Sequence, residues 1–243
     1  MPRLPNLSAG LGRIQFPERI ILIALLLIGG CTWAFVEIAD EVVEGESRHF
    51  DAAILQALRD PLQPATPRGP TWLLQAARDI TALGGITVIT LVTLASLGFL
   101  WLQRKRRAVW MVAFSVLGGA LLMHGMKTAF GRERPSLVPH LVEVSSLSFP
   151  SGHSTLSAVI YLTLGVLLAR TTPDRATRIY VVAVAMLLVV LIGLSRIYLG
   201  VHYPTDVLAG WLVGSAWALL CAAVTRWFQL RGKSQKTTPQ RVI

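Results

Sequence analysis

The sequence contains few charged residues and few cysteines. Only 15% of its 243 residues are charged, and only 13 are Asp or Glu. The two cysteines, Cys31 and Cys221, both lie within apolar runs. This rules out a framework of several disulfides and argues against a cysteine metal site, so we interpret both as small packing residues. There are no tandem repeats, no low-complexity segments and no separate stretch of soluble-domain composition.

Apolar residues are abundant instead. They make up 53% of the chain, and the mean hydropathy is +0.57. A membrane-spanning helix needs about 20 mostly apolar residues. The sequence therefore predicts an all-α, polytopic membrane protein of one domain with six transmembrane helices, at 20–38, 81–102, 108–126, 154–169, 179–194 and 207–228.

The net charge of +10 could indicate a nucleic-acid partner, but its distribution fits membrane topology instead. With six spans, both termini and the second and fourth loops share one side. That side of the membrane holds 15 of the 23 Lys and Arg residues, including Arg226 near the end of the last span, but only two of the 13 acidic residues. The positive-inside rule then predicts cytoplasmic tails at 1–19 and 229–243 around a core at 20–228. We expect a bacterial inner membrane protein with no nucleic-acid partner; the sequence does not indicate its oligomeric state.

The first outer loop, residues 39–79, carries apolar residues at helical spacing in two short segments. Prolines separate the two segments, so we predict two short amphipathic helices at the membrane surface. They could form a lid for a lipid substrate or a simple surface loop. The apolar positions are Phe50, Ile54, Leu55 and Leu58 in the first segment, and Trp72, Leu73 and Ala76 in the second.

A polar stretch between the last two spans contains His202 and Asp206, four residues apart. Pro204 fits the first turn of a helix, so both side chains can share one face. The carboxylate can then hold one imidazole nitrogen and leave the other free as a nucleophile or base. Arg196, at the start of the same stretch, offers a planar donor group for a phosphate-like anion.

A second polar stretch follows the third span and contains Lys127 and Arg134. Seven residues are nearly two helical turns, so both side chains share a face if the helix continues. Pro135 disfavours helical geometry at Arg134, so we expect the helix to end there. The two cations can converge on one anion. The alternative is a basic pair that reaches the lipid headgroups.

The third polar stretch, Phe149–Ser154, immediately precedes the fourth span. Ser151 and Gly152 place backbone N–H groups at a helix N-terminus, which favours anion binding. His153 lies in the first turn beside them. By itself, this histidine could equally be an ordinary residue of a helix end.

Together, Lys127-x6-Arg134-Pro135, Pro150-Ser151-Gly152-His153 and Ser195-Arg196-x5-His202-x3-Asp206 resemble the three signature motifs of the type 2 phosphatidic acid phosphatase superfamily. All three match in order, and with six spans all three lie on the outer side. The resemblance implies that His202 is the nucleophile that forms a phosphohistidine, that Asp206 orients it, and that His153 is the general acid and base. It also implies five phosphate ligands: Lys127, Arg134, Ser151, Gly152 and Arg196.

The implied activity is hydrolysis of a lipid phosphate or diphosphate without a metal or other cofactor, because three cations supply the electrostatic stabilisation. Candidate substrates are phosphatidate, lysophosphatidate, phosphatidylglycerol phosphate and undecaprenyl diphosphate. The reaction needs His202 neutral and His153 protonated at its start, which predicts a bell-shaped pH dependence.

Three alternatives remain open. A phosphotransferase could use the same site with a lipid acceptor. A catalytically silent lipid-binding or transport protein would be expected to lose a motif residue, and none is lost here. A haloperoxidase of the same superfamily is disfavoured by the six spans, because the haloperoxidases that resemble this chain are typically soluble.

Overall fold

The structure is a computed structural model that describes residues 16–234, and the side chains of residues 21–228. Most of the two predicted tails lies outside the described residues. The described chain folds as helices joined by turns and loops. These helices are α1 (Phe16–Glu44), α2 (Arg48–Ala57), α3 (Thr71–Ala82), α4 (Ile86–Leu102), α5 (Arg106–Phe130), α6 (Gly152–Thr171), α7 (Arg175–Tyr198) and α8 (Pro204–Ser234).

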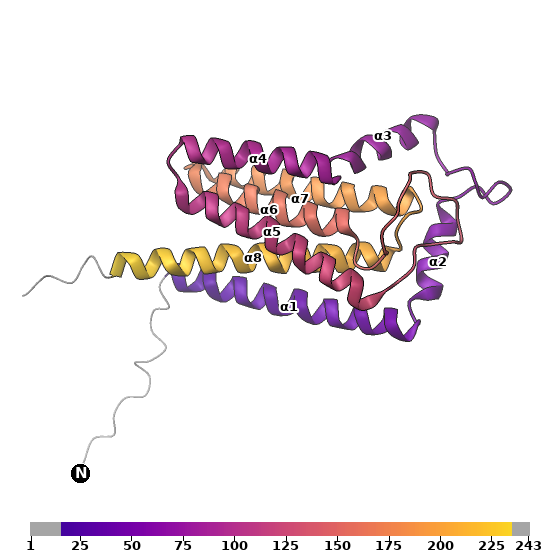
Figure 1. Ribbon diagram of the computed structural model, residues 1–243, viewed down its shortest axis with the longest axis horizontal. Coiled ribbons are helices and arrows are strands. Elements are labelled where there is room, and N and C mark those ends of the chain that lie inside the picture. Colours follow the sequence, from indigo (N-terminus) through magenta and orange to yellow (C-terminus); the bar gives the residue numbers. More distant parts are fainter. Residues whose placement is uncertain (1–15, 235–243) are drawn as a thin grey trace, which may run out of the picture.

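Six long helices lie side by side along the long axis of the molecule (Figure 1). At one end lie α2, α3 and the loop between α5 and α6, whereas α1 begins and α8 ends at the opposite end. In the centre, α6 packs against α5, α7 and α8, and α8 also packs against α1. In the most apolar 18-residue stretch of α6, half of the residues are buried in the bundle. In the corresponding stretch of α1, none is buried. The polar N-terminus of α6 is therefore held inside the bundle.

Five of the described helices are long and apolar enough to cross a membrane, and α3 with α4 can form a sixth span. The predicted span at 81–102 is broken, because α3 ends at Ala82, α4 begins at Ile86 and the two are bent by 46°. Gly84 lies within this break. A Cβ atom on Gly84 would lie 2.5 Å from Ile192 of α7, so only glycine permits this close contact. The count of six spans holds only if the bent pair is one span.

The segment between α1 and α4 contains the two short helices α2 and α3. The helix α2 packs on α8 and on the α5–α6 loop, and α3 packs on α7 and on the loop that follows it. Leu55 of α2 is fully buried in a cluster with Val138 and Val207, and Ala77 of α3 is buried against Leu199 and Val201. The two helices are thus docked on the segments that carry the polar stretches. Their position at a membrane surface stays a prediction.

Two glycines bring α8 close to α6 near the polar end of the bundle. A Cβ atom on Gly210 would lie 2.8 Å from the carbonyl oxygen of Ser151, and one on Gly214 would lie 2.5 Å from that of Thr155. Small residues at this spacing let two helix backbones approach closely. As a result the first turns of α6 and α8 lie together, and the backbone N–H of Ser151 donates to the carbonyl oxygen of Asp206 at 2.9 Å.

Candidate active site

A cavity of about 520 Å³ is lined by residues of the α3–α4 break and the α5–α6 loop, among others. Residues from the α3–α4 break, α5, the α5–α6 loop, α6 and α7 form its wall. Six of the eight predicted site residues line it, from stretches far apart in the sequence: Lys127, Arg134, Gly152, His153, Arg196 and His202. The other two, Ser151 and Asp206, are fully buried behind the wall.

His202 lies just before α8, and Asp206 lies in the first turn of that helix. Nδ1 of His202 is 3.2 Å from Oδ2 of Asp206, so the predicted contact is confirmed. The same oxygen accepts a hydrogen bond from the backbone N–H of Tyr203 at 2.9 Å and another from the hydroxyl of Ser148. A proton on Nδ1 leaves the lone pair on Nε2. In this tautomer Nε2 accepts a hydrogen bond from Nη1 of Arg134 at 3.2 Å, so a phosphoryl group that took over this N–H would lie against Nε2.

The pKa of His202 is lowered to about 3, chiefly by burial and also by the positive charges of Arg134 and Arg196. The hydrogen bond and charge of Asp206 act in the opposite direction but do not outweigh burial. Because the pKa is lowered, the neutral imidazole predominates at every pH above about 3. This is the form that a nucleophile requires.

We therefore expect His202 to stay neutral between pH 8 and about 5, where a histidine with an ordinary pKa of about 6.5 becomes protonated. The measurement is ¹⁵N NMR of histidine-labelled protein in micelles. Loss of a resonance in His202→Gln identifies the ring signals of His202. If these signals moved to the positions of a doubly protonated ring by pH 5, burial would not control this imidazole.

The helix that carries Lys127 ends earlier than the sequence predicted. α5 ends at Phe130, because Gly131 adopts a left-handed conformation with φ 61° and its N–H donates to the carbonyl oxygen of Lys127 at 3.0 Å. Arg134 therefore lies in the following loop, so the expected helix end at Arg134 is wrong and the condition for a shared helix face is not met. Both side chains nevertheless line the same cavity.

Backbone and hydroxyl oxygens hold the three cations in place. Lys127 donates to the carbonyl oxygen of Leu147. Arg134 donates to the carbonyl oxygens of Ser146 and Val201, and both of these bonds are 2.6 Å long. Arg196 is 3% exposed and donates to the hydroxyl of Thr81 at 3.0 Å, while its buried Nε has no partner within the described part of the chain. Among residues 21–228, none of the three forms an ion pair. Their positive charge can therefore attract a multiply charged anion.

Ser151 caps α6. Its hydroxyl accepts hydrogen bonds from the backbone N–H and the hydroxyl of Ser154, at 3.5 and 3.1 Å. Because its own N–H donates to Asp206, only one of the two predicted backbone donors, Gly152, lies at the cavity. A phosphate contact from Ser151 stays a prediction. Next to Gly152, the ring of His153 lies beside the turn at Gly84, where an added Cβ would be 3.3 Å from the ring.

Sequence reasoning missed Asp51 and Arg132, which complete the surroundings of Asp206. Nη1 of Arg132 is 2.7 Å from Oδ1 of Asp206, and Nη2 is 2.7 Å from Oδ2 of Asp51. Arg132 lies between Lys127 and Arg134 in the same polar stretch. This position could have marked it as a candidate site residue. The sequence contains no comparable signal for Asp51, which is 81 residues from Arg132.

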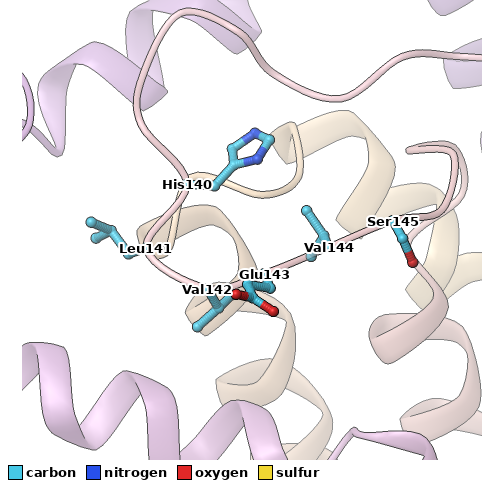
Figure 2. A pocket seen from close by; sticks show the side chains of 6 residues that line it. All are labelled: His140, Leu141, Val142, Glu143, Val144 and Ser145. Carbon is cyan, nitrogen blue, oxygen red and sulfur yellow. The ribbon is translucent and has the colours of Figure 1, made fainter.

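The loop segment 140–145 separates the candidate site from a second cavity of about 690 Å³. Figure 2 shows the six side chains of this segment, which line the second cavity. Four of them also line the first cavity, of about 520 Å³, which we call the cationic cavity: Val142, Glu143, Val144 and Ser145. Glu143 is the one carboxylate among the described residues of the cationic cavity. The wall at this point is thus a single stretch of loop.

Within residues 21–228, no cluster of three or more His, Cys, Asp or Glu side chains could hold a metal ion. Activity without a metal stays a prediction.

The fold and site define a helical integral membrane protein with a cationic, histidine-containing cavity at one end of its bundle. The chain belongs to the PAP2 superfamily, whose family model matches residues 108–230.

The relatives of the chain include two bacterial phosphatases. Phosphatidylglycerophosphatase B of Bacillus subtilis is 32% identical over 203 residues, which are 82% of this chain and 89% of that protein. Decaprenylphosphoryl-5-phosphoribose phosphatase of Mycobacterium tuberculosis is 33% identical over 150 residues, or 59% of this chain and 75% of that protein. The crystal structure of a transmembrane PAP2-type phosphatidylglycerolphosphate phosphatase from Bacillus subtilis superposes with a TM-score of 0.58 at 28% identity, covering 93% of this chain and 98% of that one.

Proposed function

We propose that this chain is a membrane lipid phosphatase that hydrolyses a phosphate monoester or diphosphate through a phosphohistidine on His202. The convergence of three cations without ion-pair partners on a cavity that also contains His153 and His202 carries this proposal. Phosphoryl transfer needs positioning and charge neutralisation above all, and these residues supply both.

In the first step, the lone pair on Nε2 of His202 attacks phosphorus, and the bond from phosphorus to the lipid oxygen breaks. His153 gives its proton to the departing oxygen. Asp206, which accepts from Nδ1, stabilises the positive charge that develops on the imidazole. In the second step, His153 takes a proton from water, the water oxygen attacks phosphorus, and the bond between nitrogen and phosphorus breaks. Inorganic phosphate leaves, and both histidines regain their initial protonation states.

The apolar part of the cavity wall supports a lipid substrate. Ile86 of α4, Met123 of α5 and Leu156 of α6 line it together with the cations. Ile86 is also 68% exposed on the side of the bundle. A lipid can thus place its phosphate among the cations while its chains stay in the bilayer. The charge distribution supports cytoplasmic termini and a site at the outer face of the membrane, which we propose to be a bacterial inner membrane.

The test is phosphate release by the purified protein in detergent with EDTA. We expect release from at least one of phosphatidate, lysophosphatidate, phosphatidylglycerol phosphate and undecaprenyl diphosphate, and the order of rates would identify the preferred class. Loss of activity in EDTA that magnesium restores would contradict a metal-independent reaction. If no lipid releases phosphate but labelled phosphate passes to an added acceptor lipid, the chain is a phosphotransferase and not a hydrolase.

A further inference from the structure

Asp51 is a fully buried carboxylate on α2, outside all three motifs. Its Oδ1 accepts from the backbone N–H of Thr205 at 3.1 Å. Its Oδ2 accepts from the hydroxyl of Thr205 at 2.7 Å and from Nη2 of Arg132 at 2.7 Å. Asp51 thus binds the first turn of α8, the turn that also contains Asp206. A buried carboxylate with this many partners has one fixed orientation, because losing any of them would leave a buried polar group unpaired.

Arg132 connects Asp51 to Asp206. Its Nη1 donates to Oδ1 of Asp206 at 2.7 Å and to the hydroxyl of Thr205 at 2.8 Å. Its guanidinium also lies over the ring of Tyr203, 4.1 Å from the centroid. Fixed at both ends and on one face, the planar guanidinium acts as a rigid spacer between two carboxylates.

The two oxygens of Asp206 therefore have different hydrogen-bond partners. Oδ1 is occupied by Arg132, and Oδ2 accepts from His202, Ser148 and the backbone N–H of Tyr203. If the carboxylate turned out of its present plane, Oδ2 would move away from Nδ1 of His202. Arg132 holds this plane through its bond to Oδ1, and Asp51 holds Arg132 in position.

We propose that Asp51 is a positioning residue that, through Arg132, holds Asp206 in the orientation that fixes the tautomer of His202. This inference rests on the proposed function for its effect on the reaction, but its effect on the imidazole is independent of substrate. The proposal means that α2, which lies outside the three motifs, helps to orient the imidazole of His202. The alternative is an ion pair that only stabilises the fold.

Asp51→Asn tests the proposal, because it keeps the shape of the side chain and removes the charge that attracts Arg132. We expect kcat to fall on the order of 10- to 100-fold, with KM changed less than about threefold. The matched control is Asp79→Asn, the same change at an exposed position of the neighbouring helix α3, which should behave as wild type. The double variant with Asp51→Asn and Arg132→Gln should have the same kcat as Arg132→Gln alone, because Asp51 acts on Asp206 only through Arg132.

The second readout is ¹⁵N NMR of the His202 ring, which needs no substrate. We expect one tautomer with hydrogen on Nδ1 in the wild type and in Asp79→Asn, and a mixture of tautomers in Asp51→Asn. An unmixed tautomer in Asp51→Asn overturns the proposal, as does a further fall in kcat in the double variant. If wild type releases no phosphate from any lipid, the proposed function fails, and the NMR result alone decides the positioning role.

Discussion

His202→Ala is expected to lower the rate of phosphate release by at least about 10⁴-fold, or about 5.5 kcal/mol of transition-state stabilisation. In the proposed mechanism, the substitution removes the atom that forms the bond to phosphorus. Nε2 of His202 is the ring nitrogen that Asp206 leaves free, and it lies 3.2 Å from Arg134 in the wall of the cationic cavity. The variant should still bind substrate, because the three cations remain.

Two measurements on His202→Ala separate loss of the nucleophile from loss of the fold. Labelled phosphate from the lipid should attach to the wild-type protein after an alkaline quench, which preserves phosphohistidine, and should not attach to the variant. The control is His124→Ala, at an exposed position one helical turn before Lys127, which should keep full activity and labelling. Labelling of His202→Ala at the wild-type level would assign the nucleophile to another residue.

Contacts within one motif could be predicted from the sequence. The spacing of His202 and Asp206, with Pro204 between them, was enough to predict that they touch, because a helix start fixes geometry over four residues. The same reasoning failed for Lys127 and Arg134, because Gly131 ends α5 between them. The positive φ of Gly131 ends the helix locally, and the spacing of the motif residues does not predict it.

Contacts between distant segments could not be predicted. Arg196 donates to Thr81, 115 residues away, and Asp51 binds Thr205 across 154 residues. Both depend on how α2 and α3 dock on the bundle, which tertiary packing decides and local periodicity does not. The close approach of α7 to the α3–α4 break at Gly84 likewise depends on tertiary packing.

His153→Gln is expected to lower phosphate release from a lipid by about 10²- to 10⁴-fold, the range of a lost general acid and base. The size of the effect should depend on the leaving group. A lipid alkoxide leaves slowly without a proton, whereas the phenolate of an aryl phosphate leaves unprotonated. In a single turnover with an aryl phosphate, the variant should therefore phosphorylate His202 nearly as fast as wild type does.

The second half-reaction gives a sharper result for the same variant. In the proposed mechanism His153 also takes a proton from the attacking water, so the phosphohistidine formed from the aryl phosphate should accumulate in His153→Gln and decay slowly. The matched control is His140→Gln, in the loop segment beside the neighbouring cavity (Figure 2), where neither step should change. Equal slowing of alkyl and aryl substrates, without accumulation, would mean that His153 positions phosphate and transfers no proton. Because Gly152 and His153 begin α6 together, the two functions occupy adjacent residues, and only the dependence on the leaving group distinguishes them.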